Sequence, residues 1–207
     1  MTEQRTDEWL AQRAGKFTGS KFADLLARNK KTGEPLKAYR DLIWQVVVER
    51  MSGQPVEGPE GYALQWGSDL EAFARQEYEL LTGNTVEEVG FIQHPLYEFC
   101  GVSPDGLIGD DAGIEIKCPK SSAIHLERYI SGVPEEYMPQ IQGCMWVTNR
   151  ARWNFVSYDP RMPESHRILV IEVKRDDEFC KRLEDAVIKA EEEAKALIEQ
   201  LTTRKAA

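Results

Sequence analysis

The sequence lacks several features that would assign it to a specialised class of protein. It has no apolar run long enough to cross a membrane, and charges at Glu3, Arg5, Asp7 and Glu8 lead us to expect no secretory signal. Its four cysteines are widely spaced and include no CxxC pair, which argues against a zinc site, a redox motif or an iron–sulfur cluster. Internal repeats and low-complexity segments are also missing. We therefore expect reduced thiols in a cytoplasmic protein that has no contact with a membrane.

Size and composition are those of an ordinary globular protein. The chain has 207 residues, of which 42% are hydrophobic and 29% are charged. This length is enough to bury one core without disulfides or structural metals. We therefore expect a single domain over residues 1–207.

The charge is acidic overall but unevenly distributed. A net charge of −9 argues at first against a polyanionic partner, because long-range repulsion slows the encounter. Residues 1–50, however, carry ten Lys or Arg against seven Asp or Glu. A basic surface formed by this part of the chain remains compatible with the composition.

Hydrophobic periodicity and turn residues predict alternating helices and strands, hence an α/β fold with a central mixed sheet flanked by helices. Helices are predicted over Glu8–Arg13, Ser20–Arg28 with Ser20 as N-cap, Ala38–Met51, Trp66–Leu81, Ser122–Ile130, Met138–Val147 and Asp176–Leu201. Strands are predicted over Val86–Gln93, Phe99–Val102, Ile114–Cys118, Trp153–Tyr158 and Ile168–Val173. The last helix carries an apolar seam that favours packing on the core: Leu183, Val187, Ala190, Ala194, Leu197 and Leu201.

The candidate catalytic residues lie in a predicted hairpin in the middle of the chain. Ser103–Gly106 precedes a Gly/Asp-rich turn, and an Ile-Glu-Ile-Lys strand follows. Alternate residues of a strand share a face, so Glu115 and Lys117 point one way while the isoleucines enter the core. If the hairpin turns near Asp111, Asp105 lies roughly opposite Lys117.

Two carboxylates and an ammonium group at one place suggest phosphoryl chemistry. Repulsion between Asp105 and Glu115 is relieved when a hard divalent cation accepts their oxygens as ligands. Such an ion polarises a phosphate oxygen and lowers the pKa of a bound water, which Lys117 can orient or help to deprotonate. A Pro-Asp-Gly turn or an alternating strand is common by itself. Together, at this spacing, they match the PD-(D/E)xK pattern of nucleases.

Further segments extend the match beyond this motif. They are residues 9–18 (WLAQRAGKFT), 66–71 (WGSDLE), 103–106 (SPDG), 115–119 (EIKCP), 137–147 (YMPQIQGCMWV) and 158–162 (YDPRM). In this order the chain, from about Trp9 to Val173, resembles the YqaJ/lambda-type phage exonuclease family. The resemblance implies a restriction-endonuclease-like core.

The resemblance also implies a metal site. Asp105, Glu115 and the Ile116 carbonyl match the family's Mg²⁺ ligands, and Lys117 matches the residue beside the nucleophile. Glu71 matches a helical carboxylate on the side of a second ion, so two Mg²⁺ ions are implied, for which Mn²⁺ can substitute. Gln140 matches a glutamine of the catalytic pocket.

Other residues match positions that bind the end of the DNA. Arg13, Ser20 and Ser103 correspond to the family's pocket for the 5′-phosphate, where an arginine fork and hydroxyl donors suit the ligand. Tyr137 is a weaker candidate beside Gln140.

The implied function is exonucleolytic. Family members digest one strand of linear double-stranded DNA from its 5′ end to mononucleotides and leave a 3′ overhang for a single-strand annealing protein. Their homotrimeric ring encloses the DNA, so we expect basic residues to line a channel: Lys16, Lys21, Arg28, Lys30, Lys31 and Lys37. The cytoplasm of a bacterium or of a phage-infected host is the implied location.

Two alternatives remain open at this point. A PD-(D/E)xK endonuclease of the restriction type would cut covalently closed circular DNA, whereas an end-dependent enzyme would leave it intact. A non-catalytic DNA-binding recombination scaffold would retain the fold but lose an acid or the lysine. The presence of Glu71, Asp105, Glu115 and Lys117 favours activity.

Overall fold

A computed structural model describes residues 4, 6–56 and 62–205 of the chain, which forms two compact units. The first unit comprises Met1–Glu57, Gly90–Ser103 and Asp176–Ala207, and the second comprises Gly58–Val89 and Pro104–Arg175. Among the helices of the described residues, none combines the length and the apolar character that a membrane crossing requires.

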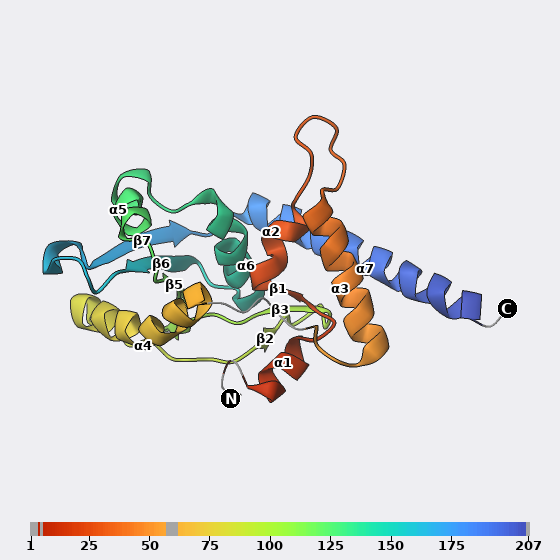
Figure 1. The fold of residues 1–207 in the computed structure, drawn as a ribbon, viewed down its shortest axis with the longest axis horizontal. Coiled ribbons are helices and arrows are strands. Elements are labelled where there is room, and N and C mark those ends of the chain that lie inside the picture. Colours follow the sequence, from red (N-terminus) through yellow and green to blue (C-terminus); the bar gives the residue numbers. More distant parts are fainter. Residues whose placement is uncertain (1–3, 5, 57–61, 206–207) are drawn as a thin grey trace. The chain divides into compact units, whose positions relative to one another are not determined.

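The first unit is mainly helical. Its elements are α1 (Asp7–Arg13), β1 (Phe17–Thr18), a 3₁₀ turn (Gly19–Lys21), α2 (Phe22–Leu25), α3 (Lys37–Ser52), β2 (Ile92–Gln93), β3 (Cys100–Val102) and α7 (Asp177–Lys205). Strand β3 is central in a small sheet and pairs in parallel with β1 and antiparallel with β2. Helices α2, α3 and α7 pack on one another (Figure 1).

The seam of the terminal helix packs on the core as expected. Leu183, Val187, Ala190 and Ala194 of α7 have no exposed surface. Leu201, near the end of the helix, is 37% exposed. The first part of this apolar seam therefore packs within the first unit, chiefly against α3, and the last turns of the helix are less buried.

The second unit is built on a mixed sheet. Its elements are α4 (Tyr62–Thr82), β4 (Gly106–Ile108), β5 (Ala112–Lys117), α5 (Ser122–Ser131), a 3₁₀ turn (Glu135–Tyr137), α6 (Met138–Thr148), β6 (Arg152–Tyr158), a second 3₁₀ turn (Glu164–His166) and β7 (Ile168–Lys174). The strand order is β4-β5-β6-β7, with β5 and β6 parallel and the outer pairs antiparallel. Helix α4 lies on one side of this sheet, and α5 and α6 lie on the other (Figure 1). The predicted mixed α/β fold with flanking helices is confirmed.

Helices cover both faces of strand β5. Ile114 and Ile116 pack in a buried cluster with Ala74 and Tyr78 of α4, so the isoleucines enter the core as predicted. Glu115 belongs to the opposite face, yet it too is fully buried. Sequence alternation identifies the two faces of the strand, but it does not reveal that both are covered.

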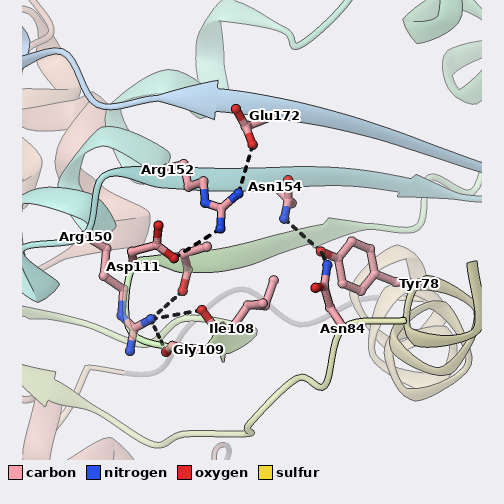
Figure 2. Close-up of polar contacts among 10 residues, drawn as sticks. Tyr78, Asn84, Ile108, Gly109, Asp111, Arg150, Arg152, Asn154 and Glu172 are labelled. Atoms are coloured by element: carbon pink, nitrogen blue, oxygen red, sulfur yellow. Dashed lines mark hydrogen bonds and ion pairs between the residues drawn. The ribbon is translucent and has the colours of Figure 1, made fainter. Parts of the chain in front are cut away.

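Arginine side chains fasten the β4–β5 hairpin to the start of β6. Arg150 donates to the carbonyl oxygens of Ile108, Gly109 and Ala112 at 3.3, 2.6 and 2.7 Å (Figure 2). Arg152 forms ion pairs with Asp111 in the turn and with Glu172 on β7. The hairpin therefore has a fixed position on the sheet, and its open end carries Asp105.

Two details differ from the sequence-based prediction. The predicted strand Val86–Gln93 is reduced to β2, because the chain passes from the second unit to the first at Gly90. Glu87 forms only an isolated bridge with Leu107. Ser20 does not cap a helix, since it lies inside a 3₁₀ turn, and helix α2 is only four residues long.

Candidate active site

Asp105 and the strand β5 come together at the open end of the hairpin. Gly106 pairs with Ile114, so Asp105 stands level with Glu115, two residues short of the predicted position opposite Lys117. Its Oδ2 accepts a hydrogen bond of 2.6 Å from the backbone N–H of Ile116. The carboxylate is thus held beside the strand by main-chain geometry.

The buried Glu115 and the partly buried Lys117 form an ion pair on the same face. Oε1 of Glu115 accepts a hydrogen bond from Nζ of Lys117. Oε2 of Glu115 is buried and has no hydrogen-bond partner in the part of the chain that the structure describes. A buried carboxylate oxygen without a partner is costly, so this atom points to a cation or donor from outside the chain.

The electrostatics of the three groups are strongly coupled. Burial and the nearby Glu115 raise the pKa of Asp105 to about 7, although Lys117 and the Ile116 N–H act in the opposite direction. Burial alone would lower the pKa of Lys117, but Glu115 and Asp105 outweigh it and hold that pKa above its usual value. These charges therefore favour the protonated form of Lys117, which is a cation and a hydrogen-bond donor.

The remaining predicted residues lie on neighbouring helices. Glu71 of α4 forms an ion pair of 3.3 Å with Arg75. Gln140 lies in the first turn of α6 and is half-buried. Within residues 4, 6–56 and 62–205, no group of three or more His, Cys, Asp and Glu side chains is arranged to hold a metal ion. The structure therefore joins Asp105, Glu115 and Lys117, and the ligand role of Glu71 stays a prediction.

The donor set of this site suits a hard divalent ion. Two carboxylates at the same level of the hairpin repel one another, and one of their oxygens lacks a partner, which is the arrangement that Mg²⁺ or Mn²⁺ relieves. Burial raises the pKa values of the Cys118 and Cys144 thiols, so they are neutral and do not compete as thiolate ligands. The residues present fit the implied ion.

The three predicted phosphate-binding residues meet in the first unit. Ser103 Oγ accepts hydrogen bonds from Nη1 of Arg13 at 2.9 Å and from Nε1 of Trp9 at 3.0 Å. Nη2 of Arg13 lies 3.4 Å from the hydroxyls of both Thr18 and Ser20. The guanidinium also stacks on the Trp9 ring, 4.1 Å from its centroid. We call these five residues the Arg13 cluster.

The Arg13 cluster holds a cation that has hydroxyl partners. Burial lowers the pKa of Arg13 to about 10, an effect that Glu49 partly offsets, so the side chain stays charged at neutral pH. No carboxylate of the described residues forms an ion pair with it. Sequence reasoning missed Trp9 and Thr18, although Trp9 stands four residues before Arg13 on the same helical face.

Solved structures resemble the whole chain. LHK-Exo, an alkaline exonuclease from Laribacter hongkongensis also solved in complex with dAMP, matches with a TM-score of 0.88 and 37% identity, over 97% of this chain and 98% of that one. A phage related exonuclease from Haemophilus somnus 129PT matches with a TM-score of 0.69 over 90% of this chain and 96% of that one. Its 15% identity is evidence for a shared fold alone. The fold is restriction-endonuclease-like.

Two sequence relatives match this chain over only part of their own length. YqaJ of Bacillus subtilis (strain 168) is 29% identical over 193 residues, which are 92% of this chain and 55% of that protein. ExoD of Escherichia coli (strain K12) is 33% identical over 55 residues, which are 27% of this chain and 62% of that protein. The chain thus spans little more than half the length of these relatives. The model of the YqaJ-like viral recombinase domain matches residues 8–151, and the chain belongs to this family.

Proposed function

We propose that the protein is a metal-dependent exodeoxyribonuclease that degrades one strand of linear double-stranded DNA from 5′ to 3′. The observation that carries the proposal is the meeting of Asp105, Glu115 and Lys117 at the end of one hairpin. Family membership and the similarity to an alkaline exonuclease support a nuclease role. The proposed products are mononucleotides and a duplex that carries a single-stranded 3′ overhang.

Asp105, Glu115 and the Ile116 carbonyl are the proposed ligands of Mg²⁺, with Mn²⁺ as a substitute and Glu71 as the carboxylate for a second ion. When bound, the metal polarises the scissile phosphate and makes a water molecule more acidic. The orphaned Oε2 of Glu115 supports this assignment, because it is the buried oxygen most in need of a cation.

The protein's own groups supply orientation and charge. Lys117 is protonated, so its Nζ donates hydrogen bonds to the attacking water or to a phosphate oxygen and balances negative charge as the P–O bond breaks. Glu115 fixes Nζ in place by accepting from it. Gln140 is proposed to contact the scissile strand from the first turn of α6.

The Arg13 cluster is the proposed pocket for a terminal 5′-phosphate. An arginine fork flanked by hydroxyls and backed by an aromatic ring presents several donors to one anion. Ser103 belongs to this cluster and stands two residues before Asp105 in the sequence. The covalent chain therefore links recognition of the end to cleavage.

The assembly proposed for this activity is a homotrimeric ring that delivers its product to a single-strand annealing protein. Support comes from the charge distribution, because the basic excess lies within residues 1–50 of an otherwise acidic chain. Basic residues that line a channel attract the phosphate backbone of DNA. An acidic outer surface does not prevent the DNA from entering the ring.

A plasmid assay separates the proposed function from its alternatives. With Mg²⁺, a linear duplex labelled at a 5′ end should release the label as a mononucleotide at once, while a 3′ label should remain in a long single strand. Covalently closed circular DNA should stay intact. Cleavage of the circle would indicate a restriction-type endonuclease, and binding of ends without any hydrolysis would indicate a scaffold.

Arg13→Ala tests the phosphate pocket. We expect the variant to digest a 5′-phosphorylated duplex about ten- to a hundredfold more slowly, because a charge-assisted bidentate contact of roughly 1.5–3 kcal/mol is lost. Digestion of a 5′-hydroxyl duplex should change little. Arg13→Lys is the matched control, since it keeps the charge but not the fork. Equal losses on both duplexes would remove the phosphate assignment.

A further inference from the structure

Helix α5 has an inverted pattern of burial. Its buried residues are polar, namely His125 with no exposed surface and Arg128 with 4%. Its apolar residues face outward, and Ile130 is 92% exposed. A helix usually buries its apolar stripe, so a buried arginine on α5 indicates that this side chain has a specific structural or functional role.

A directional hydrogen-bond network fixes the buried Arg128. His125 Nε2 lies 2.7 Å from the carbonyl oxygen of His166 and donates to it, while Nδ1 lies 2.8 Å from the hydroxyl oxygen of Ser157. The oxygen of Ser157 then accepts from Nη1 of Arg128 at 2.9 Å. The His125 ring therefore acts as an anchor behind the guanidinium.

The other arm of Arg128 reaches the surroundings of Lys117. Nη2 of Arg128 donates to the hydroxyl of Tyr137 at 3.3 Å. The Tyr137 ring is stacked on Phe155, and Nζ of Lys117 lies 5.2 Å from its centroid. Ser157 is the partner of Lys117 in the β5–β6 register. Both arms of the guanidinium thus end at groups that border Lys117.

No carboxylate compensates Arg128 within the residues that the structure describes. It forms no ion pair there, and its buried Nε has no hydrogen-bond partner. Burying a cation in this way is unfavourable for stability alone, since an apolar residue of similar volume avoids the loss of hydration. The rings of Tyr137 and Phe155, each centred 5.5 Å from Cζ, give the guanidinium cation–π contacts but no counter-charge, which favours a functional role for the buried arginine.

We propose that Arg128 is a positioning residue for DNA cleavage, because its guanidinium holds the Tyr137 ring against Lys117 and so keeps Nζ directed at the scissile phosphate. The inference rests on the proposed function and deepens it. Tyr137 supplies the wall against which the lysine side chain packs, Ser157 and His125 supply the anchor, and Arg128 connects the two.

Arg128→Met is the first test, because methionine keeps much of the volume and removes the donors. We expect kcat for nucleotide release to fall about 10- to 100-fold, as misplacement of a reacting group predicts. KM for DNA ends, and the dissociation constant for DNA measured in Ca²⁺, should stay within about twofold of wild type. Arg182→Met is the matched control, since it removes an exposed arginine from α7, which belongs to the other unit, and should leave kcat unchanged.

Tyr137 gives a second test that does not depend on removing a buried charge. Tyr137→Phe keeps the ring and loses only the hydroxyl that Arg128 holds, and kcat should fall about three- to tenfold. In Arg128→Met the same change should have no further effect, because the two side chains act as one unit. Additive losses, an unchanged kcat in either folded variant, or a loss confined to KM would overturn the proposal. An inactive wild type would instead defeat the proposed nuclease function.

Discussion

Lys117→Ala is expected to lower Mg²⁺-dependent DNA hydrolysis by about 10²- to 10³-fold or more, the loss typical of removing one preorganised donor to a developing charge. Lys117 is held on Glu115 and stays protonated, so it is the cation of the hairpin that can meet the phosphate. Nucleotide release from a linear duplex under single-turnover conditions measures the effect directly.

Binding should respond differently from turnover in this variant. Without Nζ, Glu115 and Asp105 lose a compensating charge, so the affinity for Mg²⁺ should not fall and DNA binding should persist. Lys120→Ala is a suitable control, because Lys120 is an exposed lysine three residues further along the chain. Wild-type turnover in Lys117→Ala, or an equal loss in both variants, would contradict the proposed role.

The sequence predicted the hairpin well because its determinants are local. Turn residues and the alternation of β5 locate Asp105, Glu115 and Lys117 within one short segment, where few pairings are possible. The prediction was wrong by two residues in register. The pairing of Gly106 with Ile114 depends on how tightly the turn closes, and composition alone does not set this.

Burial that depends on packing against residues distant in the sequence could not be predicted from the sequence. Arg128 and His125 look like the polar face of a surface helix, and only the packing of α5 on β6 turns them inward. The same holds for Val86–Gln93, where an apolar run predicts one strand although the chain changes unit midway. Periodicity reports which residues share a face, but it does not report what covers that face.

The Arg13 cluster could be predicted in part from the sequence. Family resemblance grouped Arg13, Ser20 and Ser103, which lie up to 90 residues apart in sequence, and the structure brings their side chains together. Trp9 and Thr18 completed the cluster only once the fold was known. Their place within the matching segment of residues 9–18 was the available signal.

Asp105→Asn is expected to make the metal-free protein more stable while it abolishes Mg²⁺-dependent activity. Asn keeps an oxygen that accepts from the Ile116 N–H and removes the charge that Glu115 repels. A carboxyl pKa of about 7 implies an upper limit of about 4 kcal/mol at pH 8, since one pKa unit corresponds to about 1.4 kcal/mol. Partial exposure reduces the expected gain to roughly 1–2 kcal/mol.

Thermal unfolding at pH 8 in EDTA and in excess Mg²⁺ measures both halves of this prediction. In EDTA the melting temperature of Asp105→Asn should exceed that of wild type by about 2–8 °C, at ~2–4 °C per kcal/mol for a chain of this size. Mg²⁺ at about a hundred times its dissociation constant should stabilise wild type by about 2.7 kcal/mol and the variant far less. Asp110→Asn, in the exposed turn of the same hairpin, should match wild type in both buffers. If Asp105→Asn melts lower in EDTA and gains as much from Mg²⁺ as wild type does, the carboxylate is a structural group and the metal binds elsewhere.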